Sequence, residues 1–78
     1  MDEKLFKFIL KCQKNYNKPD CHSFKIMIDK GTAYVECRKY EVYVEYYVDN
    51  CKKQWCGQAI AAANLLLKLK ADENTIDM

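Results

Sequence analysis

Two adjacent lysines, Lys52 and Lys53, stand in the stretch CKKQWC and could hold an anion. If Asp49 or Asn50 caps a helix that runs to about Leu69, both lysines lie in its first turn. Two cations there oppose the helix dipole. A phosphate bound by the N-terminal amides and both ammonium groups would offset that cost, so the stretch predicts a phosphate contact. The alternative is a pair of solvated lysines without a ligand.

The same stretch contains a C-x4-C pair, Cys51 and Cys56, whose spacing also occurs in structural zinc sites. On a helix, residues five apart differ by about 140° around the axis, so these two thiols would not converge on one ion. The other cysteines are Cys12, Cys21 and Cys37. We expect no metal site and no cofactor.

Catalytic constellations are not apparent in the sequence. The single histidine, His22, directly follows Cys21. Adjacent side chains rarely face each other, so the two do not form a nucleophile and its base. We find no catalytic carboxylate pair, Gly-rich phosphate loop or triad. We therefore expect a protein that is not an enzyme, with no catalytic residues and no small-molecule substrate.

Length and composition predict one small folded domain. The chain has 78 residues, half of them hydrophobic, and its 13 basic and 11 acidic side chains leave a net charge of +2. That charge neither requires nor excludes RNA. Five cysteines are an odd number, the N-terminus lacks the apolar run of a signal peptide, and no stretch is long enough to span a membrane. We expect an intracellular protein of the cytoplasm or nucleus, with free thiols and no membrane partner.

Hydrophobic periodicity predicts the elements that position these residues. A helix from Asp2, its N-cap, to about Asn15 is indicated by apolar residues at spacings of three and four. Residues 23–29, 33–39 and 41–48 alternate between apolar and polar, as in strands with one covered face. The final helix carries a stripe formed by Trp55, Ala59, Ala62, Leu66 and Leu69.

The predicted fold class is α+β, in the order α-β-β-β-α. Three antiparallel strands form the sheet, and both helices pack on its apolar face. Residues 1–70 form the domain, and the polar residues 71–78 form a C-terminal tail that frays.

This order, with a lysine pair opening the last helix and an alanine-rich stripe after it, resembles the double-stranded RNA-binding domain. The resemblance covers about residues 2–70. The family's "KKxAK" start, "AA" pair and "AL" correspond here to KKQWC, to Ala59–Ile60, and to Ala63 with Leu65 or Leu66. The resemblance implies a domain that lies along one face of an A-form duplex and reads its shape through two minor grooves and the intervening phosphates.

The three RNA-contacting surfaces that the resemblance implies are retained only in part. The lysine pair matches the start of the last helix, but Cys56 stands where a third lysine is usual. The loop between the first two strands is the short DKGT, without the family's Gly-Pro-x-His signature. On the first helix, a line of lysines and one glutamine replace the usual polar set. The candidate RNA-binding residues are Lys4, Lys7, Lys11, Gln13, Lys52 and Lys53.

The outward face of the predicted sheet is the candidate protein interface. Its candidate contact residues are Met27, Tyr34, Arg38, Tyr43 and Tyr47. Tyr, Met and Arg are enriched in interfaces. An exposed edge strand could also pair across a two-fold axis. The alternative is an ordinary solvated sheet face, since tyrosine favours strands. Glutamates among the tyrosines argue against stacking of single-stranded bases.

We therefore predict a non-catalytic module that acts mainly through protein–protein interaction, with a partner protein or with itself as a homodimer. The resemblance implies an RNA-processing or RNA-silencing context, with weak or no binding of double-stranded RNA. The alternative is a genuine double-stranded RNA-binding domain that grips phosphates through Lys52, Lys53 and the first helix.

Overall fold

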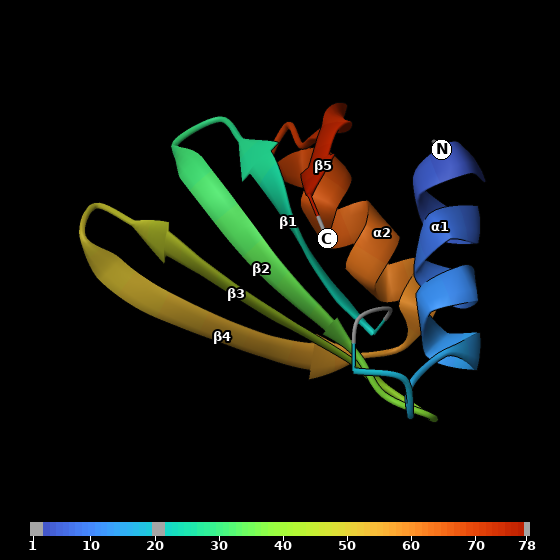
Figure 1. Cartoon of the computed structure of the whole chain (residues 1–78). Coiled ribbons are helices and arrows are strands. Elements are labelled where there is room, and N and C mark those ends of the chain that lie inside the picture. Colours follow the sequence, from blue (N-terminus) through green and yellow to red (C-terminus); the bar gives the residue numbers. More distant parts are fainter. Residues whose placement is uncertain (1–2, 20–21, 78) are drawn as a thin grey trace.

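The described part of the chain is α+β, with two helices and a five-stranded antiparallel sheet of spatial order β4-β3-β2-β1-β5 (Figure 1). The computed structural model describes residues 3–19 and 22–77, so the predicted N-cap Asp2 and Cys21 lie outside the described residues. The elements are α1 (Glu3–Lys14), β1 (Ser23–Ile28), β2 (Gly31–Cys37), β3 (Val42–Val48), β4 (Cys51–Gly57), α2 (Ala59–Lys68) and β5 (Asp72–Asp77).

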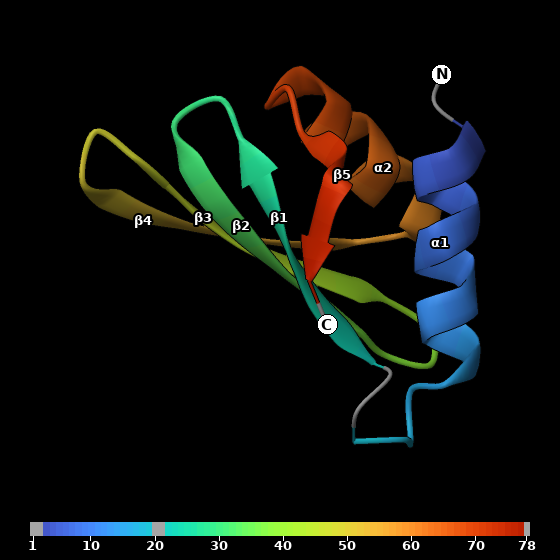
Figure 2. The same cartoon turned by 45° about the horizontal axis from the view of Figure 1, so that its top comes forward.

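One face of the sheet forms the core, and both helices cover it (Figures 1 and 2). Side chains of successive strand residues point to opposite faces, so the buried residues of β1, β2 and β3 alternate with more exposed ones. As the alternation predicts, the following inward residues are buried: Phe24, Ile26 and Ile28 of β1, Val35 and Cys37 of β2, and Val42 and Val44 of β3. Tyr46, also predicted to face inward, is only half-buried. The helices complete the core with Leu5, Ile9 and Cys12 from α1 and with Ala59, Ala62, Ala63 and Leu66 from α2.

The stretch 51–57 is strand β4 and not the start of the final helix, so the prediction there was wrong. Asp49 and Asn50 have φ angles of 52° and 67°. Asp and Asn adopt this left-handed conformation more readily than other non-glycine residues. Positive φ at both central residues is the mark of a two-residue type I′ hairpin turn. The chain therefore reverses at once, and Val48 to Val42 pair with Cys51 to Gly57.

The end of α2 directs the chain into a fifth strand. Lys70 has a φ of 58°, and its N–H donates to Leu67 O while the N–H of Ala71 donates to Leu66 O, both at 3.0 Å. This pair of hydrogen bonds is a Schellman motif, which ends a helix and reverses the chain. Residues 72–77 then lie beside β1 as β5. The predicted fraying tail and three-stranded sheet are therefore wrong, and the predicted α-β-β-β-α order is replaced by one with five strands.

Strand β5 is anchored to β1 through one threonine. The pairing between these strands is irregular, because Lys25 lies opposite Asp77 and Met27 opposite Asp72. Thr75 bridges the irregular segment, since its hydroxyl accepts a hydrogen bond from Met27 N at 2.9 Å and donates one to Asp72 O at 2.6 Å. A side-chain hydroxyl thus replaces the backbone group that a regular ladder would offer.

Replacing Thr75 by valine, which keeps the shape but removes both hydrogen bonds, should lower the free energy of unfolding by about 1–2 kcal/mol. Thr75→Ser retains the hydroxyl and should retain most of the stability. Urea unfolding of both variants measures the difference. An equal effect of the two substitutions would show that the hydroxyl does not hold β5.

The ring of Trp55 covers the backbone of Gly57 on the helix-facing side of β4. A Cβ added at Gly57 would lie 2.6 Å from both Cη2 and Cζ2 of the indole. Such a separation is far below van der Waals contact, so the absence of a side chain at Gly57 allows the ring to lie where it does. Trp55 is half-buried and packs against the core.

We expect Gly57→Ala to displace the indole and to destabilise the protein by about 1–3 kcal/mol, as overpacking does. In a Trp55→Ala background the same substitution should cost little, because the clash is gone. Unfolding of the four proteins of this double-mutant cycle, followed by circular dichroism, tests the coupling. If Gly57→Ala costs the same in both backgrounds, the ring is not the cause.

Candidate functional site

The predicted phosphate site at Lys52 and Lys53 is not formed. Both residues lie in β4, and because they are neighbours in a strand their side chains point to opposite faces of the sheet. Lys52 lies opposite Tyr47 on the outer face, while Lys53 lies opposite Tyr46 on the helix-facing side. The helix N-terminus that would supply amide groups begins later, at Ala59. The lysine pair therefore cannot grip one phosphate jointly.

Lys52 is instead part of a polar network on the outer face. Its ammonium lies 3.0 Å from Glu45 Oε1, and the hydroxyl of Tyr43 donates to Glu45 Oε2 at 2.8 Å. The hydrogen bond from Tyr43 and the ion pair with Lys52 hold the pKa of Glu45 below its ordinary value. The same carboxylate raises the pKa of Lys52 and of Tyr43.

A second part of the network surrounds Arg38. Its guanidinium contacts two carboxylates, Glu36 at 3.0 Å and Glu41 at 3.1 Å. The Tyr34 hydroxyl donates to Glu36 at 3.2 Å, and the Arg38 guanidinium lies over the Tyr43 ring at 5.5 Å. Tyr34, Arg38 and Tyr43, predicted as interface residues, are thus brought together and hold one another in place.

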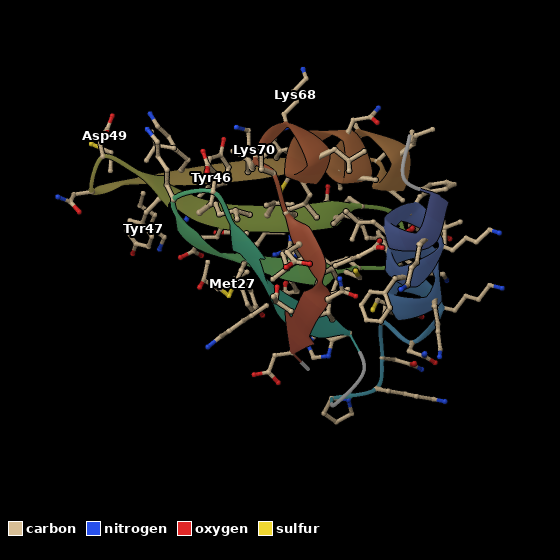
Figure 3. All side chains as sticks on the ribbon, turned by 90° about the horizontal axis from the view of Figure 1, so that it is seen from above. Met27, Tyr46, Tyr47, Asp49, Lys68 and Lys70 are labelled. Carbon is tan, nitrogen blue, oxygen red and sulfur yellow. The ribbon has the colours of Figure 1, made fainter. Side chains whose placement is uncertain are left out.

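The two other predicted interface residues, Met27 and Tyr47, lie on the same face, near the β1–β2 turn and the β3–β4 turn respectively. They are 55% and 52% exposed, and because side chains alternate along β1 and β3, both lie on the face away from the buried side chains (labelled in Figure 3). Their apolar surface is not covered by the polar network. The outer face therefore divides into an internally bonded polar part and a smaller exposed apolar part.

The predicted basic line on the first helix is present. Lys4, Lys7 and Lys11 border a groove of about 230 Å³ between α1 and β5, whose floor includes Phe8 and Ile76. Lys4 also lies 3.8 Å from Glu73 of β5. Glu73 of β5 thus approaches the lysines that were predicted to face RNA.

The sixth predicted RNA-binding residue, Gln13, has a structural contact. Its side-chain amide donates to Arg38 O at 3.1 Å and so joins α1 to the turn between β2 and β3. The predicted RNA-binding residues thus lie in separate places: the lysine line on α1, Gln13 at its C-terminal end, and the two lysines on opposite faces of β4.

The open edge of β4 is the feature that the sequence analysis missed as part of a site. β4 ends the sheet on one side, and Cys51, Lys52, Lys53, Gln54 and Cys56 are exposed. An apolar alternation would have signalled a strand, but only Trp55 of this stretch faces the core. Lysine and glutamine are good helix formers, and Asp and Asn are common N-cap residues. The local residue preferences therefore favoured a helix over a strand.

The four described cysteines differ in their surroundings. Cys12 and Cys37 are buried in the core, where the hydrogen bond between the two thiols and burial raise the pKa of Cys37. Cys51 and Cys56 are exposed and, five residues apart in a strand, point to opposite faces. Within residues 3–19 and 22–77, no group of three or more His, Cys, Asp or Glu side chains could hold a metal ion.

Comparison of the chain with protein-family models, with curated proteins and with solved structures found no match. Among the described residues, neither helix has the length and apolar character needed to cross a membrane.

The Glu45 pKa gives a direct test of the outer-face network. Tyr43→Phe removes the largest cause of its lowering, so the pKa of Glu45 should rise toward its ordinary value. A carboxylate with a lowered pKa stabilises the fold above its unfolded-state pKa and loses this contribution as the pH falls through the lowered value. As the pH falls, Glu45 should therefore become protonated, and its contribution to stability should be lost, at a higher pH in Tyr43→Phe than in the unmodified protein. Carboxyl-carbon NMR titration measures the shift.

Tyr34→Phe is the matched control, because the Tyr34 hydroxyl donates to Glu36 and leaves the Tyr43–Glu45 contact in place. A Glu45 pKa that is the same in Tyr43→Phe and in the unmodified protein would contradict the assignment.

Proposed function

We propose that this protein is a non-catalytic interaction module that forms a homodimer, in which β4 pairs with β4 of a second copy. The observation that carries the proposal is the open, seven-residue edge of β4. An edge strand presents unpaired N–H and C=O groups to any strand that can align with it. A two-fold axis through that edge would join two sheets into one.

The hairpin geometry indicates which backbone groups are available. In a two-residue hairpin the residues flanking the turn, Val48 and Cys51, exchange hydrogen bonds, and the pattern alternates from there. Residues 51, 53, 55 and 57 therefore bond to β3, while Lys52, Gln54 and Cys56 direct their N–H and C=O groups to the open edge. These three residues would form the new ladder.

One register satisfies both the ladder and the charges. A two-fold axis perpendicular to the sheet can centre on Lys52, Lys53, Gln54 or Trp55. Centring on either lysine places like charges directly opposite each other, which is destabilising. Centring on Trp55 pairs only residues 53–57 of the seven-residue strand, whereas centring on Gln54 pairs the whole of residues 51–57 and sets Lys53 opposite Trp55 of the second copy. An ammonium beside an indole is a favourable pairing.

The outer face of such a dimer would be continuous across the new ladder. The network around Glu45 and Arg38 borders β4, so its rigid tyrosines would flank the junction from both copies. A preformed surface loses little side-chain entropy on association. The exposed Met27 and Tyr47 lie on the same face and remain available to a further protein.

Binding of double-stranded RNA has less support. The lysine pair is split between two faces, and only Asp29 and Lys30 separate β1 from β2, so this turn does not form a long groove-reading loop. The lysine line on α1 remains as a candidate surface for phosphate contact. We therefore propose weak or no RNA binding. The RNA-processing or RNA-silencing context rests on the family resemblance alone.

Substitution at the centre of the proposed ladder tests the dimer. Gln54→Pro removes an N–H that points to the open edge, a position where proline is tolerated within a sheet. We expect the unmodified protein to sediment as a dimer and Gln54→Pro to weaken self-association by at least about tenfold. Gln54→Thr keeps the N–H and should remain dimeric. Circular dichroism verifies that each variant is folded.

Amide exchange tests the register. Protection at Lys52, Gln54 and Cys56 should rise with protein concentration, whereas protection at Lys53 and Trp55 should not depend on it. A protein that sediments as a monomer at all concentrations, or a Gln54→Pro variant that associates as well as the unmodified chain, would refute the proposal.

A further inference from the structure

A second surface lies where the C-terminal end of α1 meets the turn between β2 and β3 (Figure 2). A cavity of about 450 Å³ opens there, lined by Leu10, Gln13, Lys14, Tyr16, Lys39 and Tyr40. This volume is within the range of small-molecule sites. The β2–β3 turn precedes β3, whereas Asp49 and Asn50 follow it. The cavity is therefore separate from the β3–β4 turn, at which the proposed dimer edge begins.

The rings of Tyr16 and Tyr40, which line this cavity, both lie close to the Lys39 ammonium. The Lys39 ammonium lies 5.9 Å from the ring centroid of Tyr16 and 5.2 Å from that of Tyr40. Both rings are exposed, and Tyr40, at 75%, is the most exposed of the large hydrophobic side chains among the described residues. Neither ring belongs to the core, so burial does not account for their placement.

The relative position of the two tyrosines is set by the fold. Tyr16 follows α1, and Tyr40 lies in the turn after β2. The hydrogen bond from the Gln13 side chain to Arg38 O joins these segments at 3.1 Å, and Arg38 N also donates to Glu41 O at 2.8 Å across the turn. The aromatic walls are therefore held by both side-chain and backbone contacts.

The charge of the cavity selects the ligand. Among the described residues that line the cavity are two lysines, Lys14 and Lys39, and no carboxylate. Exposed ring faces favour a planar partner, and the ammonium groups favour an anion. A ligand that combines a planar ring with an anionic group matches both properties. Among biological ligands, nucleotides have this combination, and a base that stacks on tyrosine can do so whatever its sequence.

We propose that this cavity binds a nucleotide, with the base on the Tyr40 and Tyr16 rings and the phosphate on Lys14 and Lys39. Entry of the base between the rings would displace the Lys39 ammonium toward the phosphate. The nucleotide could be free or part of a single-stranded RNA, since both offer the same chemistry. The proposal does not depend on the dimer, because the cavity is complete within one copy.

Titration of the full chain with AMP, with a short single-stranded oligoadenylate and with inorganic phosphate tests the site by amide NMR. We expect shifts confined to residues 10–16 and 38–41 with the nucleotide probes. Tyr40→Leu should weaken this binding by about tenfold or more, as loss of a stacking platform does. Tyr47→Leu, at an exposed tyrosine on the outer face, is the matched control and should bind normally.

The probes distinguish the two sources of the nucleotide. Binding of both AMP and the oligonucleotide supports a site for a single nucleotide, and binding of the oligonucleotide alone supports a site for a strand. Equal binding of inorganic phosphate, equal binding by Tyr40→Leu, or no shifts with any probe would overturn the proposal. Sedimentation of the same samples shows whether the result is independent of the dimer.

Discussion

The left-handed backbone at Asp49 and Asn50 is the constraint on which the rest of the architecture depends. It reverses the chain within two residues, so the next seven residues extend the sheet as β4. Because β4 uses this stretch, α2 begins only at Ala59. A different backbone conformation at these two residues would leave the sheet with one strand fewer, and Trp55 would lose its place against the core.

The part of the fold that the sequence predicts well is the part with strong periodicity. Residues of β1, β2 and β3 alternate between apolar and polar, and their burial follows that alternation. Of the apolar residues of α1, Leu5, Ile9 and Cys12 are likewise buried, whereas Leu10 is exposed. In these segments hydrophobic burial contributes most of the stabilisation, and the pattern of side chains indicates directly which residues are buried.

The segments whose secondary structure was predicted wrongly are those in which backbone geometry, and not the apolar pattern, decides the structure. Asp and Asn serve equally as helix caps and as left-handed turn residues, so the DN pair has two interpretations. Lys70 ends α2 in a conformation usually taken by glycine, and no glycine stands there to signal it. Strand β5 is polar and depends on the Thr75 hydroxyl, a contact with a residue far away in the sequence. The candidate site changed for the same reason: Lys52 and Lys53 are adjacent in sequence but separated by the sheet.

The outer face and the edge of the sheet have different physical characters. On the face, carboxylates, tyrosines and cations satisfy one another, so partner binding there would need few rearrangements. At the edge of β4, the unsatisfied groups belong to the backbone, and they specify the direction and spacing of a partner strand more strictly than side chains do. The distinction explains why a small domain can combine a rigid surface with a strand that is still able to pair.

Strand β5 has a consequence for how far assembly can proceed. It covers the β1 edge through contacts between residues 48 apart in sequence, whereas the other four strands pair with their immediate neighbours in the chain. Closing the chain over such a separation costs more conformational entropy than pairing neighbouring strands does. β5 is itself the opposite edge strand of the sheet, but it is short, irregularly paired and acidic, features that discourage strand pairing. If β4 pairs as proposed, assembly would therefore close after two copies. Without it, both edges would be receptive, and head-to-tail addition would have no geometric end, as in a fibre.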